Sequence, residues 1–194
     1  VLHEEAILPA WRAGIPIHIR NTNNPAARGT RLVEKHQDLE SIVTGIAGSK
    51  GFSLIHVSKF MMNQEVGFAM RVLQILVDYE IPIEHIPSGI DSLSIVVRTA
   101  ALTADKEKEI TRRLRDELGM EDITVSRNLG IVMIVGEAME QTVGVTARAA
   151  GALSRAGINL ELIIQGASEI SVIFGVREQL THLAIKALYR EFFS

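Results

Sequence analysis

Residues that could hold both a carboxylate and an ammonium group lie between Gln64 and Asp91. In the sequence QEVGFA, residues 64–69, a glycine separates a strand-like segment from a helix-like one. Glycine lets a ligand approach the backbone closely, and the first N–H groups of a helix are unpaired at the positive end of its dipole. Further on, Glu84 and Asp91 can accept hydrogen bonds from an ammonium, and Ser88 adds a neutral partner. These residue types suit a free amino acid.

The segment that carries these residues occurs twice, at a constant offset of 77 residues. Laid over 131–174 without a gap, 54–97 has 11 identical residues in 44 positions, including Gly67/Gly144 and Glu84/Glu161. About half of the other positions exchange one apolar residue for another. An ungapped match of this length indicates two copies of one structural unit.

The first copy predicts the order βαββαβ. The strands are expected at 52–60, 81–87, 93–100 and 122–128, and the helices at 66–80 and 105–118, the second ended by Gly119. The buried face of the first helix is expected to hold Val66, Met70, Leu73, Leu76 and Val77. This order is the ferredoxin-like plan, an α+β fold with two helices on one antiparallel sheet.

The second copy lacks its last strand. Its elements are expected at 129–137, 143–156, 158–166, 168–176 and 179–193, and a sixth would fall near position 199. A sheet without this strand would expose an unpaired edge, whereas the strand-like segment 41–48 has no place in the first copy. We therefore expect 41–48 to complete the second unit, so that the first unit is inserted within the second.

Several candidate site residues also have a structural explanation. Gly67 recurs as Gly144, so the tight turn alone could require it, and Glu84 recurs as Glu161, as a solvated strand residue would. Asp91 is replaced by Ser168, and a charge present in one copy only favours a ligand at that copy. The small residues of the second helix, such as Ala149 and Ala152, favour close packing and assembly.

Composition excludes several classes of protein. The chain of 194 residues has a net charge of −3 and 5% aromatic residues, which argues against binding of nucleic acid. No apolar run reaches the roughly 20 residues that span a bilayer, so no membrane partner is expected. The chain has no cysteine, which suits the cytoplasm, and its six histidines show no spacing typical of a metal site.

The whole chain resembles aspartate kinases. VLHEEAILPAWRAGIPIHIRNTNNPAARGT, residues 1–30, is similar to the end of their catalytic domain, although Glu4 stands where the family commonly has proline. MNQEVGF, IPIEHIPSGIDSLSIVV and GINLELIIQGASEISVIF resemble their two ACT domains, most of all those of monofunctional, lysine-sensitive members. The implied domains are a kinase remnant (1–33), a linker with the strand for the second ACT domain (34–50), the first ACT domain (51–128) and the second (129–194).

The resemblance implies a regulatory region. A full-length enzyme would phosphorylate L-aspartate with ATP and Mg²⁺, the first step toward lysine, methionine and threonine. This chain would hold no catalytic residue, cofactor or metal and would be inactive alone, because no phosphate-binding glycine loop is found. L-lysine is the implied effector, and a homodimer through ACT domains is the implied assembly. The effector-binding positions implied by the resemblance are Met62, Gly67, Phe68, Ile83, Glu84, Ser88 and Asp91.

Three alternatives remain at this point. Threonine could replace lysine as the effector, because the acidic pair Glu84 and Asp91 could serve an α-ammonium alone. A stand-alone ACT-type module for amino-acid binding or oligomerisation is a second reading, opposed by residues 1–33. An RNA-binding ferredoxin-like domain is the third, and the acidic pI and the lack of aromatic residues on the strands oppose it.

Overall fold

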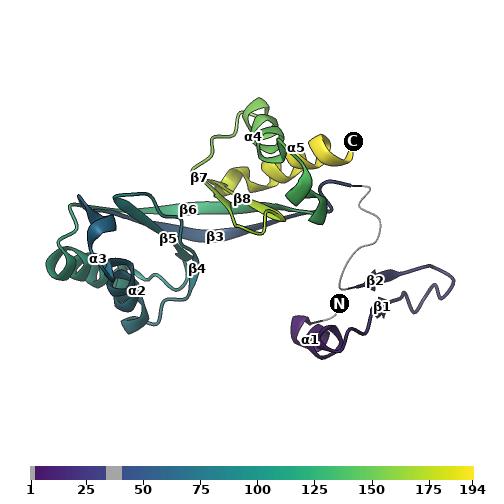
Figure 1. Cartoon of the computed structure of the whole chain (residues 1–194), viewed down its shortest axis with the longest axis horizontal. Helices are drawn as coiled ribbons and strands as arrows, with labels where there is room; N and C mark the ends of the chain where they lie inside the picture. The colour runs from purple at the N-terminus through teal and green to yellow at the C-terminus, as the bar shows by residue number, and fades with distance from the viewer. Residues whose placement is uncertain (1–2, 34–40) are drawn as a thin grey trace. The chain divides into compact units, whose positions relative to one another are not determined.

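The computed structural model describes residues 3–33 and 41–194, which belong to two units, Val1–Glu40 and Ser41–Ser194 (Figure 1). In the first unit, helix α1 (Glu4–Arg12) precedes the antiparallel strands β1 (Ile17–Ile19) and β2 (Thr30–Leu32). The His3 side chain accepts a hydrogen bond from the Glu5 N–H and so caps the helix. Residues 34–40 of the expected linker segment 34–50 lie outside the described residues.

The second unit is built on one six-stranded antiparallel sheet in the order β4-β5-β3-β6-β8-β7. The strands are β3 (Gly45–Ser58), β4 (Ile83–His85), β5 (Ser92–Arg98), β6 (Asp122–Val135), β7 (Leu162–Gln165) and β8 (Ser171–Arg177). Both ferredoxin-like repeats are present, and the first is inserted in the second as predicted. Gly45–Ser49 of β3 pair with Ile131–Val135 of β6 and thereby supply the missing strand.

The two central strands are continuous across both repeats, which the sequence did not predict. Segments 41–48 and 52–60 were expected as separate strands, as were 122–128 and 129–137, yet β3 and β6 each run for 14 residues. Their register shifts between Ser49 and Phe52 and again between Phe52 and Leu54, as β-bulges do. Gly51 and Asn128, both with positive φ, lie at these shifts. A bulge absorbs a residue without ending the strand.

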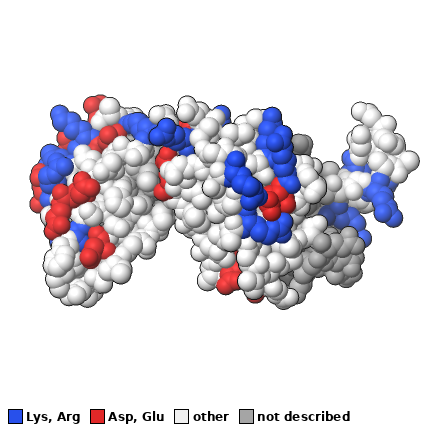
Figure 2. Space-filling model, turned by 90° about the horizontal axis from the view of Figure 1, so that it is seen from above, with Lys and Arg blue, Asp and Glu red and all other residues white. Residues whose placement is uncertain are grey.

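A pair of helices covers each end of the long β3–β6 ribbon (Figure 1). Helices α2 (Phe68–Asp78) and α3 (Ala104–Leu118) belong to the first repeat, and α4 (Val145–Arg155) and α5 (Thr181–Phe193) to the second. Short 3₁₀ turns precede α2, α4 and α5: η1 (Met62–Gln64), η2 (Glu137–Gln141) and η3 (Glu178–Leu180). Acidic and basic side chains alternate over α3, where Arg112 and Arg113 pair with carboxylates (Figure 2).

The predicted buried face of the helix after Gly67 is wrong for three of its five residues. Val66, Met70 and Val77 are 95%, 68% and 58% exposed. Leu76 is buried as predicted, and the other side chains of α2 that enter the core are Phe68, Val72 and Ile75. Nearly every residue from 66 to 77 is apolar, so two different faces of the helix have apolar residues at helical spacing. The helix also begins two residues later than predicted, at Phe68.

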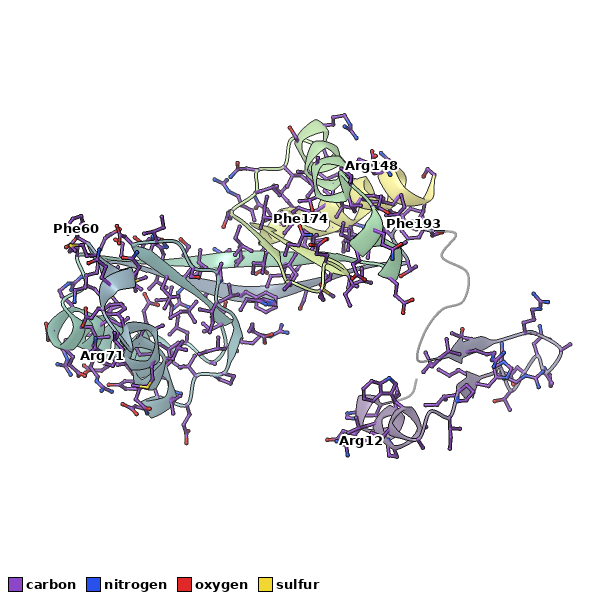
Figure 3. All side chains as sticks on the ribbon, in the orientation of Figure 1. Arg12, Phe60, Arg71, Arg148, Phe174 and Phe193 are labelled. Carbon is purple, nitrogen blue, oxygen red and sulfur yellow. The ribbon has the colours of Figure 1, made fainter. Side chains whose placement is uncertain are left out.

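Three apolar clusters hold the unit together. One lies between α2, α3 and the first repeat's strands, and a second lies between α4, α5 and the second repeat's strands, with Phe174 fully buried (Figure 3). The third, formed by Phe52, Val96, Leu129 and Ile131, covers the opposite face of the sheet where the repeats meet. None of the helices in the described residues is long and apolar enough to cross a membrane.

Candidate functional site

The turn from β3 into α2 positions the first candidate residues. Met61 (φ 58°) and Gly67 (φ 75°) both have left-handed backbone, and η1 lies between them. A Cβ on Gly67 would come no closer than 3.9 Å to its nearest neighbour, the Met70 side chain, so glycine is required here by conformation and not by space. The first helical bond runs from the Arg71 N–H to the Gly67 carbonyl at 3.1 Å, and the Phe68 N–H donates to the Glu65 carbonyl at 3.1 Å, which leaves the N–H groups of Ala69 and Met70 for other acceptors.

Two cations share one carboxylate at this turn. The Lys59 ammonium donates to Glu65 at 2.7 Å, and the Arg71 guanidinium donates to the other oxygen of Glu65. Both cations also lie over the Phe68 ring, with 5.1 Å from Lys59 Nζ and 5.8 Å from Arg71 Cζ to the ring centroid. The hydrogen bond from Lys59, with the positive charges of Lys59 and Arg71, lowers the pKa of Glu65. Arg71 is labelled on α2 in Figure 3.

Asp91 has a buried oxygen without a partner. In the hairpin before β5, the Gly89 N–H donates to the Ser92 carbonyl at 2.8 Å, and Ser88 pairs with Leu93. The Asp91 carbonyl accepts from the Lys59 N–H at 3.1 Å, which ties this hairpin to the end of β3. Asp91 Oδ1 is buried, and no hydrogen-bond partner for it lies among the described residues; the same holds for Arg71 Nε.

The structure thus brings together five of the seven candidate residues. Gly67, Ser88 and Asp91 lie at the outer end of the first repeat, and Met62 and Phe68, 8% and 3% exposed, belong to the core of the same repeat. Both apolar side chains are therefore core residues. The contact of Lys59 with Asp91, Glu65 and Phe68 connects the two halves of the site.

Glu84 and Ile83 lie elsewhere. Glu84 pairs with Arg98 at 2.8 Å, and Arg98 lies 4.2 Å from the centroid of Phe52, in the cluster on the sheet face away from α2. Ile83 pairs with Val97 and packs against the core on the helix side. Val97 is six residues along β5 from Asp91, roughly 20 Å at 3.3 Å per residue. Within one chain, Glu84 does not share a pocket with Asp91.

Sequence reasoning missed Lys59, Glu65 and Arg71. Arg71 is identical in both repeats, as Arg71 and Arg148, which by itself suggests structure rather than binding. Lys59 and Glu65 are replaced by Gly136 and Thr142 in the second repeat. A comparison of charges between the repeats, which singled out Asp91, would have found both.

Comparisons with known proteins agree with this fold. Residues 132–192 match a model of the ACT domain family. Aspartokinase 3 of Bacillus subtilis is 48% identical over 194 residues, which are all of this chain and 43% of that protein. A bifunctional aspartokinase/homoserine dehydrogenase of Haemophilus influenzae is 31% identical over 199 residues, with 100% of this chain and 24% of that protein covered.

Solved structures give the same result. The crystal structure of Clostridium acetobutylicum aspartate kinase superposes with a TM-score of 0.90 at 39% identity, over 99% of this chain and 45% of that one. A structure of aspartokinase α and β subunits has a TM-score of 0.67 at 28% identity, over 77% of this chain and 97% of that one. The chain spans less than half the length of the curated relatives named above. It matches aspartokinases along its whole length and contains their regulatory ACT region.

Proposed function

We propose that this chain is the sensing region of an aspartokinase, which binds the end product L-lysine at the outer end of the first repeat and thereby inhibits the kinase. The whole protein would transfer a phosphoryl group from ATP, with Mg²⁺, to the side-chain carboxylate of L-aspartate in the cytoplasm. The observation that carries the proposal is the buried Oδ1 of Asp91, which has no hydrogen-bond partner in the part of the chain that the structure describes. A buried acceptor without a partner costs about 1–3 kcal/mol, and an ammonium group of a ligand would satisfy it.

The surrounding groups support a zwitterionic ligand. The N–H groups of Ala69 and Met70, which precede the first helical bond of α2, suit its α-carboxylate. The unpartnered Nε of Arg71 is a further donor for that carboxylate. Asp91 would receive one ammonium, and Glu65, whose carboxylate faces Lys59 and Arg71, could exchange a partner with the second. Glu65 at the β3–α2 turn and Asp91 in the hairpin before β5 offer two carboxylates, which favours a ligand with two ammonium groups over threonine.

Feedback requires that the effector bind one arrangement of the enzyme better than another. Lys59 links the Asp91 hairpin to the start of α2, so a ligand held by both would stiffen this end of the repeat. We also propose a homodimer in which sheet edges pair. β4 is flanked by Pro82 and Pro87, which blunt that edge, so β7 is the edge better suited to pairing.

Isothermal titration with L-lysine, L-threonine and L-methionine tests the effector. We expect lysine to bind the wild-type chain, and Asp91→Asn to weaken it by about tenfold or more, since a charge-assisted hydrogen bond is lost. The matched control is Ser168→Ala, the equivalent position of the second repeat, which should leave lysine binding unchanged. Threonine binding that depends on Asp91 would show that threonine is the effector instead of lysine. Lysine binding that is unaffected by Asp91→Asn would show that the lysine site lies elsewhere in the chain.

A further inference from the structure

A cavity of about 340 Å³ lies between the two helices of the second repeat. Three of its lining residues come from the end of α4 and three from α5: Ala152, Arg155, Ala156, Ala187, Arg190 and Glu191. Ligand cavities in proteins begin near 300 Å³, so this one has room for a small molecule. Figure 2 shows basic side chains gathered over these helices.

The first repeat has the equivalent groove between α2 and α3. The corresponding residues there are Ile75, Asp78, Tyr79, Arg113, Asp116 and Glu117. The fully buried Leu76 and Leu153 fix the alignment of α2 with α4, at an offset of 77. Leu114 and Leu188, also fully buried, fix that of α3 with α5, at an offset of 74. The two grooves can therefore be compared position by position.

In the first repeat, the side chain of Arg113 fills the groove. Its guanidinium donates to Asp78 at 2.7 Å and to Glu117 at 2.6 and 3.0 Å. Its Cζ also lies 5.9 Å from the ring centroid of Tyr79. A cation held between two carboxylates and beside a ring thus occupies this groove.

Two substitutions empty the groove of the second repeat. Ala187 stands at the position of Arg113, and Ala156 stands at that of Tyr79. A guanidinium and a phenol ring are thereby replaced by two methyl groups. The cavity between α4 and α5 lies where these two side chains would be.

Two further substitutions reverse the charge of the groove. The carboxylates of Asp78 and Asp116 correspond to the guanidinium groups of Arg155 and Arg190. Arg190 is exposed and has no ion-pair partner in the part of the chain that the structure describes. A groove that surrounds a cation in the first repeat is therefore basic in the second.

The one carboxylate of this groove is already shared. Arg148, labelled on α4 in Figure 3, donates from Nε to Glu191 Oε1 at 3.1 Å, and Arg155 donates from Nη2 to Glu191 Oε2 at 2.7 Å. With Arg190, three guanidinium groups surround a single carboxylate. Like charges held close together repel, so an anion bound here would be stabilised.

The end of α4 does not oppose such an anion. The N–H groups of residues 156–158 donate to the carbonyls of Ala152, Leu153 and Ser154 at 2.9–3.2 Å. Arg155 lies in the last turn and offsets the negative end of the helix dipole.

We propose that the cavity between α4 and α5 binds an aromatic oxyanion, a small molecule that carries a carboxylate or a phosphate on a planar ring. The oxyanion takes the place of the guanidinium of Arg113 with the opposite charge, and it accepts hydrogen bonds from Arg155 and Arg190. The ring lies on the alanine side chains, in the space that Tyr79 fills in the first repeat. This site is separate from the proposed lysine site and does not depend on it.

Titration calorimetry of the 194-residue chain with benzoate and phenyl phosphate tests the site. Inorganic phosphate and benzyl alcohol, which offer the charge alone or the ring alone, should bind at least fivefold more weakly. Arg190→Gln should weaken binding of the probes by about fivefold, because one charge-assisted partner is lost at an exposed position. Ala156→Tyr returns the ring of the first repeat to the groove and should abolish binding.

The matched control is Arg115→Gln, which removes an exposed arginine from α3 and should leave the affinity unchanged. Thermal unfolding shows whether each variant folds, and Arg190→Gln alone decides the matter if Ala156→Tyr does not. If only one probe binds through Arg190, the site stands and that probe identifies its anion. The proposal is overturned if neither probe binds, if Arg190→Gln binds as the wild type does, or if inorganic phosphate binds as tightly as phenyl phosphate.

Discussion

Gly51 and Asn128 occupy equivalent positions in the two repeats and form the two irregularities of the central β3–β6 pair. Their numbers differ by the repeat offset, 128 − 51 = 77, and both have left-handed backbone, with φ 84° and 64°. Each lies where the register shifts between the strands. The repeats therefore meet at a pair of matched bulges, which let each strand pass from one unit into the other.

The bulge at Gly51 should tolerate asparagine better than alanine. A Cβ on Gly51 would meet no atom within 4 Å, so only backbone strain opposes a side chain. We expect Gly51→Ala to lower the free energy of unfolding by about 1–2 kcal/mol, and Gly51→Asn by less, because asparagine adopts left-handed backbone more readily. Asn128→Gly, the reciprocal change, should be nearly neutral. Urea denaturation measures all three, and equal costs for alanine and asparagine would contradict the assignment.

The segment before β3 should be essential to the second repeat. Val43 is 1% exposed and packs in the core with Phe174, and the Thr44 N–H donates to the Val135 carbonyl at 2.8 Å. Val43→Ala should cost about 2–3 kcal/mol from lost burial and a new cavity. Gly136→Ala should cost more, because its Cβ would collide with the Ile42 backbone. Val33→Ala, outside this unit, is the control. If thermal unfolding shows equal losses of stability for Val33→Ala and Val43→Ala, the segment before β3 is not part of the second repeat's core.

Removing the charge of Asp91 should not destabilise the unliganded chain. Its Oδ1 is buried without a partner, and an uncharged amide is easier to bury than a carboxylate. We expect Asp91→Asn to leave the free energy of unfolding unchanged or to raise it by up to about 1 kcal/mol. Asp105→Asn, in the first turn of α3, should instead lower it by about 0.5 kcal/mol, since that carboxylate complements the helix dipole. A large loss with Asp91→Asn in urea denaturation would indicate a structural role.

Acid should weaken the outer end of the first repeat through Glu65. The hydrogen bond from Lys59 lowers its pKa below the usual 4.5, so the unfolded chain binds more protons than the folded one between those two values. The stabilisation is therefore complete above pH 4.5 and is lost as the pH falls through the lowered pKa. Glu65→Gln should make stability fall less steeply in this range, as followed by circular dichroism. Glu140→Gln, at an exposed position, should keep the wild-type slope.

If dimers form through β7, a charge on that edge should separate them. Ile163 in β7 is 47% exposed, and lysine on an edge strand opposes pairing between sheets. We expect Ile163→Lys to sediment as a monomer at concentrations where the wild-type chain is dimeric. Phe60→Lys, at the outer end of the first repeat (Figure 3), is the control and should remain dimeric. Dissociation by Phe60→Lys alone would place the interface there.

Much of the fold follows from the sequence, because the two repeats constrain each other. The insertion was predicted because segment 41–48 had no role in the first repeat and the second repeat lacked its last strand. The pairing of Gly45–Ser49 with β6 confirms it. The continuity of β3 and β6 was not predictable. A glycine or asparagine between two apolar segments, such as Gly51 or Asn128, can mark either a bulge within one strand or the end of a strand. The buried face of α2 was predicted wrongly in part for a similar reason. Val66 and Phe68 are both apolar, and the left-handed backbone at Gly67 decides which of them begins the helix.

The candidate site was predictable only in part. Gly67 was identified because a glycine between a strand and a helix is visible in the local sequence. Asp91 was identified because its charge occurs in one repeat only. The ion pairs of Glu65 depend on how far Lys59 and Arg71 lie across the turn, which no spacing along the chain reveals. Glu84 fits an ammonium site by type, but its pairing with Arg98 and its sheet face follow from the tertiary fold.

The insertion also sets an order of events during synthesis. Residues 51–128 contain the strand partners of the first repeat except Leu129, which pairs with Phe52, so this repeat can fold before the rest of the second has left the ribosome. Its folding brings Ser49 beside Ile131, positions about 80 residues apart in the chain. Closing a flexible loop of that length would cost about 4 kcal/mol in chain entropy. Once the first repeat has folded, the two chain segments are already side by side, so the second repeat forms without this entropic cost.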